Sequence, residues 1–143
     1  EVNNDGSVLD WFAKRVIHIF QQVTSMVATN AGVWGQYANL MVVLGDMELG
    51  LEYQLKCCRC CNTGWELDSS LFKEVSTAQC KLARLAVAIR KRKLFFAVRS
   101  MLKSTIKRAS ENWNDSDDFK ALQEALDAVL ETEAIVKQEE ASA

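Results

Sequence analysis

The sequence predicts an all-α fold, and three observations support this prediction. The 143 residues contain no proline and only six glycines, so the chain lacks the breaks that short strands and tight hairpins need. Apolar residues recur at steps of three and four along most of the chain, which is the spacing of amphipathic helices. Hydrophobic residues make up 49% of the chain, enough for one core of ordinary domain size. We therefore expect residues 1–143 to form a single helical domain.

Six helices are predicted, over residues 8–27, 33–44, 47–60, 69–89, 93 to about 113 with its basic part at 93–108, and 117–136. The apolar stripe of the first helix consists of Leu9, Phe12, Val16, Ile19, Phe20, Val23 and Val27. Ser7 or Asp10 is its expected N-cap. Gly45 is expected to end the second helix and Asp46 to cap the third. The charged tail from Lys137 is expected to fray.

The start of the fourth helix has two interpretations. Thr63 followed by Glu66 has the spacing of a capping box, whereas Asp68 or Ser69 would cap a helix that begins later. Before the sixth helix, residues 114–118 supply turn-forming side chains and an N-cap.

Charge divides the second half of the chain into two opposite blocks. Residues 81–108 contain ten Lys or Arg and no acid, whereas residues 109–143 contain ten acids and two bases. We expect the two blocks to pair as antiparallel helices, with apolar burial supplying most of the stability. The buried residues would be Phe95, Val98, Leu102 and Ile106 against Phe119, Leu122, Leu126 and Val129. The alternative is that the basic block meets nucleic acid, an acidic membrane surface or an acidic peptide.

Residues 31–64 resemble the tetratricopeptide repeat, an antiparallel helix pair of about 34 residues. With Ala31 as the first position, the pattern places these residues at its large, small and turn sites: Trp34, Tyr37, Ala38, Met41, Gly45, Gly50 and Cys57. Ala38, Gly50 and Cys57 would lie where the two helices cross too closely for larger side chains. Gln54 and Asn62 depart from the pattern, at its Phe and Pro sites.

Four of the five cysteines lie within five positions: Cys57, Cys58, Cys60 and Cys61. On a helix this spacing points the thiols in different directions, and the chain adds only Cys80 and one histidine, His18. We therefore expect no metal and no cofactor. Adjacent cysteines also bridge poorly, so disulfides are not expected. Reactive thiols beside Lys56 and Arg59 are the remaining alternative.

Several segments together resemble the carboxy-terminal region of the tetratricopeptide repeat protein 27 family. They are residues 21–40, the repeat at 45–75 and the following helix to residue 89, with Trp65-Glu66 and the Phe-Lys-Glu-Val run at 72–75 as matching landmarks. The resemblance implies a fragment of a right-handed α-solenoid in which residues 69–138 form a capping helical hairpin. It also implies a scaffold or co-chaperone-like adaptor without catalytic residues.

The favoured function is a non-catalytic protein–protein interaction scaffold or adaptor, as the carboxy-terminal part of a larger co-chaperone-like or assembly factor. Its partners would be other proteins, with chaperones or assembly clients as candidates. The candidate partner-binding residues are Gln36, Asn39, Arg90, Lys91, Arg92 and Lys93. A clamp that binds the carboxylate of a peptide needs several Asn, Lys and Arg side chains along the concave helices, and Gln36 and Asn39 are too few to form one. The alternative is binding of nucleic acid or an acidic surface by residues 90–108, where Phe95 and Phe96 would stack or insert but are more simply core anchors.

Catalysis is not expected. The chain has no glycine-rich phosphate loop and one histidine, and its carboxylates fall on solvated helix faces. We expect no small-molecule substrate and, without an apolar run of 18 residues, no membrane span. The expected location is intracellular, in the cytoplasm, with the nucleus or a mitochondrion as the alternative because Glu1 rather than Met begins the chain and an upstream targeting segment would be missing.

Overall fold

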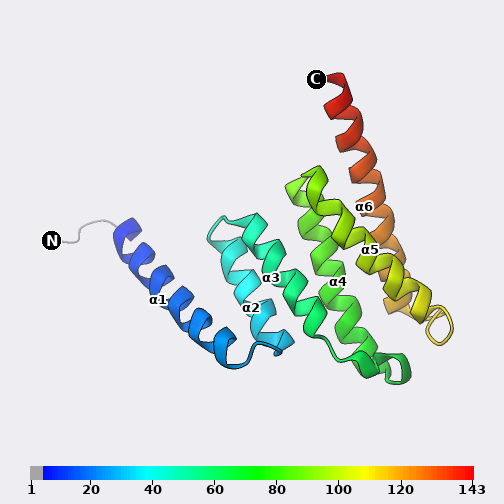
Figure 1. The fold of residues 1–143 in the computed structure, drawn as a ribbon, viewed down its shortest axis with the longest axis horizontal. Coiled ribbons are helices and arrows are strands. Elements are labelled where there is room, and N and C mark those ends of the chain that lie inside the picture. Colours follow the sequence, from blue (N-terminus) through cyan, green and yellow to red (C-terminus); the bar gives the residue numbers. More distant parts are fainter. Residues whose placement is uncertain (1–4) are drawn as a thin grey trace. The chain divides into compact units, whose positions relative to one another are not determined.

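The computed structural model describes residues 5–143, and this part of the chain is helical without any strand (Figure 1). The all-α prediction is therefore confirmed. The elements are α1 (Asp5–Met26), α2 (Ala31–Val43), α3 (Met47–Cys60), the short 3₁₀ helix η1 (Thr63–Leu67), α4 (Ser69–Ile89), α5 (Arg92–Ala109) and α6 (Asp117–Ser142). They form two compact units, one that comprises the described residues up to Cys60 and one that comprises residues 61–143. The expectation of a single domain stays a prediction.

In the first unit, α1 begins earlier than its apolar pattern indicated. Both candidate N-caps, Ser7 and Asp10, lie inside the helix, so that prediction is wrong. The Asp10 carboxylate instead pairs with the Lys14 ammonium one turn later, at 3.1 Å, in an exposed ion pair. Hydrophobic periodicity locates the body of a helix, but it does not show at which turn the helix starts.

The helix pair α2–α3 has well-formed ends. Asn30 caps α2 by accepting a hydrogen bond from the Val33 N–H at 3.1 Å, which starts the helix two residues before the predicted position. Gly45 follows α2 with φ of 91°, a left-handed conformation that glycine adopts without steric cost. The Gly45 and Asp46 N–H groups donate to the last carbonyls of α2 in a Schellman motif. Asp46 then accepts from the Leu49 N–H at 3.1 Å, so both predicted caps at this turn are confirmed.

The two helices approach each other closely at Gly50. A Cβ atom built there would lie 2.7 Å from a methyl group of Val42 and 3.3 Å from the carbonyl oxygen of Ala38. A Cβ built on Gly35 would lie 3.3 Å from the Cys57 sulfur, so the helices are also close at this second point. The seven repeat positions proposed above comprise Gly45 in the turn and six buried residues, namely Trp34, Tyr37, Ala38, Met41, Gly50 and Cys57.

The second unit begins with η1, whose residues had been interpreted as a capping box. Thr63 and Glu66 lie within this 3₁₀ turn and do not start α4, so the capping-box interpretation is wrong. Asp68 is the N-cap of α4 and accepts from the N–H groups of Ser70 and Leu71. A hydrogen bond from the Ser70 hydroxyl and these two amides lower the pKa of the Asp68 carboxyl.

Helices α4 and α6 run in the same direction, and α5 runs antiparallel to both (Figure 1). The chain reverses at Arg90, which has φ of 58°, and again before Ser116, which caps α6 by accepting from the Phe119 N–H. The predicted packing of α5 on α6 is confirmed, and α6 packs even more extensively on α4. The Ser76 hydroxyl of α4 donates to the Asp118 carbonyl of α6 at 3.1 Å. The terminal element is thus a three-helix arrangement.

The core of this unit contains most of the apolar residues that were predicted to be buried between the basic and the acidic helix. The buried ones are Phe95, Val98, Leu102, Phe119, Leu122 and Val129, whereas Ile106 and Leu126 are only half-buried. The expected fraying from Lys137 is wrong, because α6 remains helical to Ser142. Val136 is buried, Glu139 pairs with Arg90 at the end of α4, and Glu140 pairs with Arg92 at the start of α5, so this last part of α6 has partners.

The close crossing at Gly50 predicts that added bulk destabilises the first unit. Gly50→Leu should lower the free energy of unfolding by about 1–3 kcal/mol, because the side chain would overlap Val42 and the Ala38 carbonyl. Thermal or urea denaturation followed by circular dichroism measures this loss. Asn39→Leu, at an exposed position of α2, is the control and should leave stability unchanged. Equal melting curves for the Gly50→Leu variant and the parent chain would show that the helices do not cross at this position.

Apolar burial should outweigh charge pairing in the second unit. Leu122→Asp places a carboxylate at a fully buried position and should cost about 3 kcal/mol or more. Glu131→Lys, on the exposed face of α6, should change stability by no more than about 0.5 kcal/mol. Chemical denaturation of both variants tests the comparison, and similar losses for the two would mean that the apolar contacts of α6 do not dominate.

Candidate functional site

An aromatic cluster lies between the three helices of the first unit. Phe20 of α1 stacks on Tyr37 of α2 with ring centroids 5.0 Å apart, and Tyr37 stacks on Tyr53 of α3 at 4.1 Å. The Trp34 ring lies 5.5 Å from that of Tyr53, and the Lys56 ammonium lies 4.6 Å above the Trp34 ring. Stacked rings and a cation over a ring face are both attractive, so the cluster joins the three helices.

A hollow of about 350 Å³ opens over this cluster. Its lining combines aromatic and polar side chains from three helices: Gln21, Thr24, Ser25, Trp34, Tyr37, Glu52, Tyr53 and Lys56. The Tyr53 hydroxyl donates to the Tyr37 oxygen at 3.4 Å, and burial raises the pKa of Tyr53 above its usual range. Tyr53 is therefore a neutral hydrogen-bonding group at physiological pH. The hollow offers surfaces for packing and hydrogen bonding.

Gln36 and Asn39, the two candidates on α2, lie on its exposed face one turn apart. Neither lines the aromatic hollow, which uses the opposite, buried side of α2 through Trp34 and Tyr37. The structure therefore brings Gln36 and Asn39 together with each other but separates them from the aromatic residues. The exposed Val43 continues the same helix face, with 82% of its surface accessible.

A second apolar surface lies on α1 and was not predicted as a separate feature. Its members recur at helical spacing and are exposed: Val8, Trp11, Phe12, Ile19 and Met26. We call these five residues the α1 stripe. Of the stripe predicted above, Val16, Phe20 and Val23 are half-buried, Phe12 and Ile19 belong to the exposed set, and the Leu9 side chain lies outside the described residues. Trp11 and Met26 were missed by the sequence-based prediction. At helical spacing these two residues share one face with Val8, Phe12 and Ile19, beside the face that carries Phe20.

The charged groups of α5 and α6 face each other, as the two charge blocks predicted. Arg90 and Arg92 donate to Glu139 and Glu140 at 2.6 and 3.5 Å. Further along α5, Arg99 donates from one nitrogen to both oxygens of Glu133, at 3.0 and 3.1 Å. Arg108 pairs with Glu66 of η1. Several cations of the predicted basic surface are thus engaged within the second unit.

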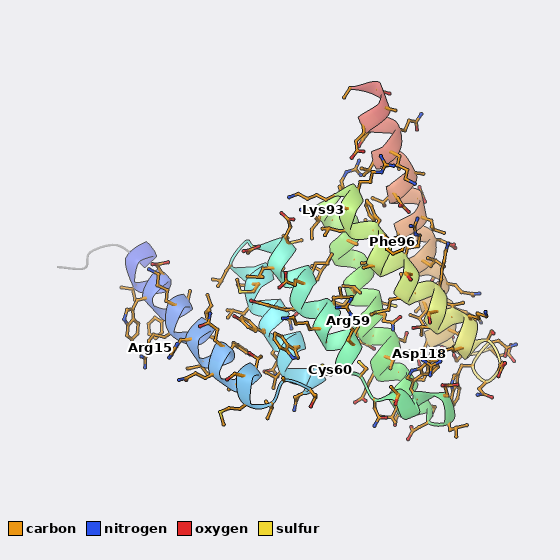
Figure 2. All side chains as sticks on the ribbon, viewed as in Figure 1. Arg15, Arg59, Cys60, Lys93, Phe96 and Asp118 are labelled. Carbon is orange, nitrogen blue, oxygen red and sulfur yellow. The ribbon has the colours of Figure 1, made fainter. Side chains whose placement is uncertain are left out.

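The start of α5 nevertheless retains a strongly basic hollow, of about 490 Å³. We call it the α5–α6 hollow; it is lined by Arg92, Lys93, Phe96, Arg99, Glu133 and Lys137. Phe96 is 68% exposed, whereas its neighbour Phe95 is fully buried, so the prediction that both anchor the core is wrong for Phe96. Consecutive helical residues point about 100° apart, and only one of two adjacent phenylalanines can face the same neighbour. Figure 2 shows Lys93 and Phe96 on α5, beside α6.

The four neighbouring cysteines differ in burial and in the direction of their thiols, unlike the ligands of a metal site. Cys57 and Cys58 are buried in α3, and Cys60, near the end of the helix (Figure 2), directs its thiol to the Ala28 carbonyl oxygen at 3.5 Å. Burial raises the pKa of the Cys60 thiol, as it does for Cys80, so both carry less thiolate at neutral pH than an ordinary cysteine. This disfavours the reactive-thiol alternative. Within residues 5–143, no group of three or more His, Cys, Asp or Glu side chains is arranged to hold a metal ion.

Two remaining observations concern the single histidine and the possibility of a membrane span. His18 is exposed on α1. Across the helices from Asp5 to Ser142, none is long and apolar enough to cross a membrane.

Comparison with known proteins gives one informative match. The chain is 25% identical over 114 residues to a tetratricopeptide repeat protein 27 homolog from Dictyostelium discoideum. The alignment covers 79% of this chain but only 13% of the relative, so the chain corresponds to a small part of that protein. No family model and no solved structure matches. The resemblance seen in the sequence is confirmed, at modest identity.

The thiol geometry predicts that the protein has no stoichiometric metal. Native mass spectrometry of chain purified in the presence of zinc should give the mass of the polypeptide alone, because the thiols around Cys57 to Cys61 do not converge. A chelator should leave the helical circular dichroism signal unchanged. One bound zinc ion per chain, or loss of helix on chelation, would contradict the prediction.

Proposed function

We propose that this chain is a non-catalytic protein–protein interaction scaffold, the carboxy-terminal part of a larger co-chaperone-like or assembly factor. The helical fold and the similarity to a tetratricopeptide repeat protein support a scaffold, because stacked helix pairs present extended surfaces to other proteins. The matched segment is a small part of the relative, so its role within a longer protein belongs to the proposal. Chaperones and assembly clients are the proposed partners.

The α1 stripe is the observation that carries this proposal. Trp11, Phe12 and Ile19 each expose more than half of their surface, at 57%, 54% and 52%. Their spacing places them on one face of the helix, and Val8 and Met26 extend the same face in both directions. Contiguous exposed apolar residues of this size are typical of protein-binding surfaces. A partner helix with its own apolar stripe would cover them in the manner of helix-in-groove recognition.

Charge on this face favours a different protein over a second copy of the chain. The Arg15 guanidinium lies 5.7 Å from the Trp11 ring, between Phe12 and Ile19 along the stripe. In an antiparallel pair of two α1 helices, Arg15 would lie close to its own counterpart, and like charges at an interface are unfavourable. A partner helix with a carboxylate near the middle of its stripe would pair with Arg15 instead.

The other predicted contact residues remain part of the proposal. Gln36 and Asn39 are accessible polar groups on α2 that suit the rim of a protein interface. Arg90, Lys91, Arg92 and Lys93 are exposed at the start of α5, where Arg90 and Arg92 already have carboxylate partners. Such internal pairing weakens the alternative of a continuous basic surface for nucleic acid. The cytoplasmic location stays a prediction.

Disrupting the α1 stripe should abolish partner capture without unfolding the protein. The test uses tagged full-length protein with Phe12→Glu, purified from cells, with quantification of the co-eluting proteins. Burying a charged side chain in an apolar contact is costly, so specific partners should fall by about tenfold or more. Leu67→Glu makes the same kind of change at an isolated residue that is 90% exposed, and this control should retain the partners.

Two results would contradict the proposal. One is the same set of co-eluting proteins, in the same amounts, for Phe12→Glu and the parent. The other is a marked fall in melting temperature for Phe12→Glu, which would show that the stripe is covered within the longer polypeptide and is not a partner surface.

A further inference from the structure

The α5–α6 hollow combines an exposed aromatic ring with an excess of positive charge. Four cationic side chains, from Arg92, Lys93, Arg99 and Lys137, line it with the single carboxylate of Glu133. Glu133 is largely buried and already interacts with Arg99 at 3.0 Å and Lys137 at 3.7 Å. The hollow therefore keeps a net positive charge after its internal pairs have formed.

The position of two of these cations at the start of α5 adds to the positive charge of the hollow. Arg92 and Lys93 occupy the first turn of α5, and the N-cap residue Lys91 makes no side-chain capping hydrogen bond. The N-terminal end of a helix carries a partial positive charge, so basic residues there are unfavourable unless an anion lies nearby. The Arg92 guanidinium lies 3.5 Å from the Glu140 carboxylate, which is long for a charge-assisted hydrogen bond. An acidic group bound from outside would relieve this repulsion.

The exposed ring of Phe96 indicates that a ligand of the hollow carries an apolar group as well as acidic groups. Its ring is 68% exposed beside the cations, and the Arg99 guanidinium lies 5.4 Å from the ring centroid. Arg99 covers one side of the ring and leaves the rest for an apolar partner group. A ligand that fits therefore has carboxylates next to an apolar side chain, which is a property of an acidic protein segment.

The carboxylates of α6 argue against a nucleic-acid strand. Glu133, Glu139 and Glu140 border the basic residues on this side. A strand carries a phosphate at every nucleotide and would meet these carboxylates along its length, whereas a protein segment can place its few acidic groups only where cations face them.

We propose that the α5–α6 hollow binds an acidic segment of a partner protein, whose carboxylates pair with Arg92 and Lys137 and whose neighbouring apolar side chain packs on Phe96. This inference rests on the proposed function in that the ligand is a protein. It adds a second contact surface, chemically distinct from the α1 stripe.

Fluorescence anisotropy with the purified 143-residue chain tests the inference. The probe is a labelled synthetic peptide in which glutamates flank leucines, and the same peptide with glutamine in place of glutamate is the neutral control. Phe96→Ala should weaken binding of the acidic peptide by about tenfold, as should the double variant Arg92→Gln, Lys137→Gln. The matched control is Lys103→Gln, Lys107→Gln, which removes the same charge from exposed positions of α5 outside the hollow and should keep parental affinity.

The outcomes separate the alternatives. The inference is overturned by absence of binding, by equal loss in the hollow and control double variants, or by full affinity of Phe96→Ala, since the last two would indicate diffuse charge attraction. Tighter binding of labelled oligothymidylate than of the acidic peptide, lost in the hollow variants, would assign the hollow to nucleic acid. Circular dichroism of each variant checks folding. The Phe12→Glu experiment probes the other unit. If Phe12→Glu retained all co-eluting proteins while the 143-residue chain still bound the acidic peptide, the α1 stripe would be excluded as a partner surface and the hollow would remain.

Discussion

Each long helix of this protein has an apolar face that only another helix can cover, and the rest of the structure depends on this constraint. In the first unit the constraint is met by an unusually close approach of α2 and α3, which Gly50 permits by having no side chain to place against Val42. In the second unit α6 is covered by both α4 and α5. Helix α1 has two apolar faces, and in the described structure only the one that carries Phe20 has a partner. The uncovered face is therefore the surface that we propose for partner binding.

Charge has a different role from apolar burial in this fold. The opposite blocks of α5 and α6 form ion pairs at intervals along the antiparallel helices, from Arg99 with Glu133 to Arg92 with Glu140. Exposed pairs such as Arg92 with Glu140 contribute little stability, but they discriminate among pairings and orientations. At the start of α5, basic residues collect around Phe96 and outnumber the carboxylates that line the same hollow. The same charge pattern that orients the hairpin thus leaves a surface suited to an acidic ligand.

The turn between α1 and α2 shows how one backbone group connects three helices. The Ala28 carbonyl accepts a hydrogen bond from the Trp34 indole at 2.8 Å and a longer one from the Cys60 thiol at 3.5 Å. Trp34 also stacks on Tyr37 within the aromatic cluster, and Lys56 lies over the Trp34 ring. This tryptophan and Cys60 accordingly have a structural explanation, whereas the exposed side chains of the α1 stripe have none within the described residues.

The sequence by itself determined the features that depend on neighbours along the chain. The helical class and the caps by Gly45 and Asp46 follow from interactions within a few residues, and a short pattern is enough to recognise them. The pairing of α5 with α6 was also predictable, because opposite charge and matching apolar stripes accompany a short connection. Only the tertiary structure decided which face of α1 is covered, that Phe95 is buried while Phe96 is exposed, and that α6 also packs on α4 and stays helical to its end. These outcomes depend on residues distant in the chain, and a periodic pattern shows that a face is apolar without showing what will cover it.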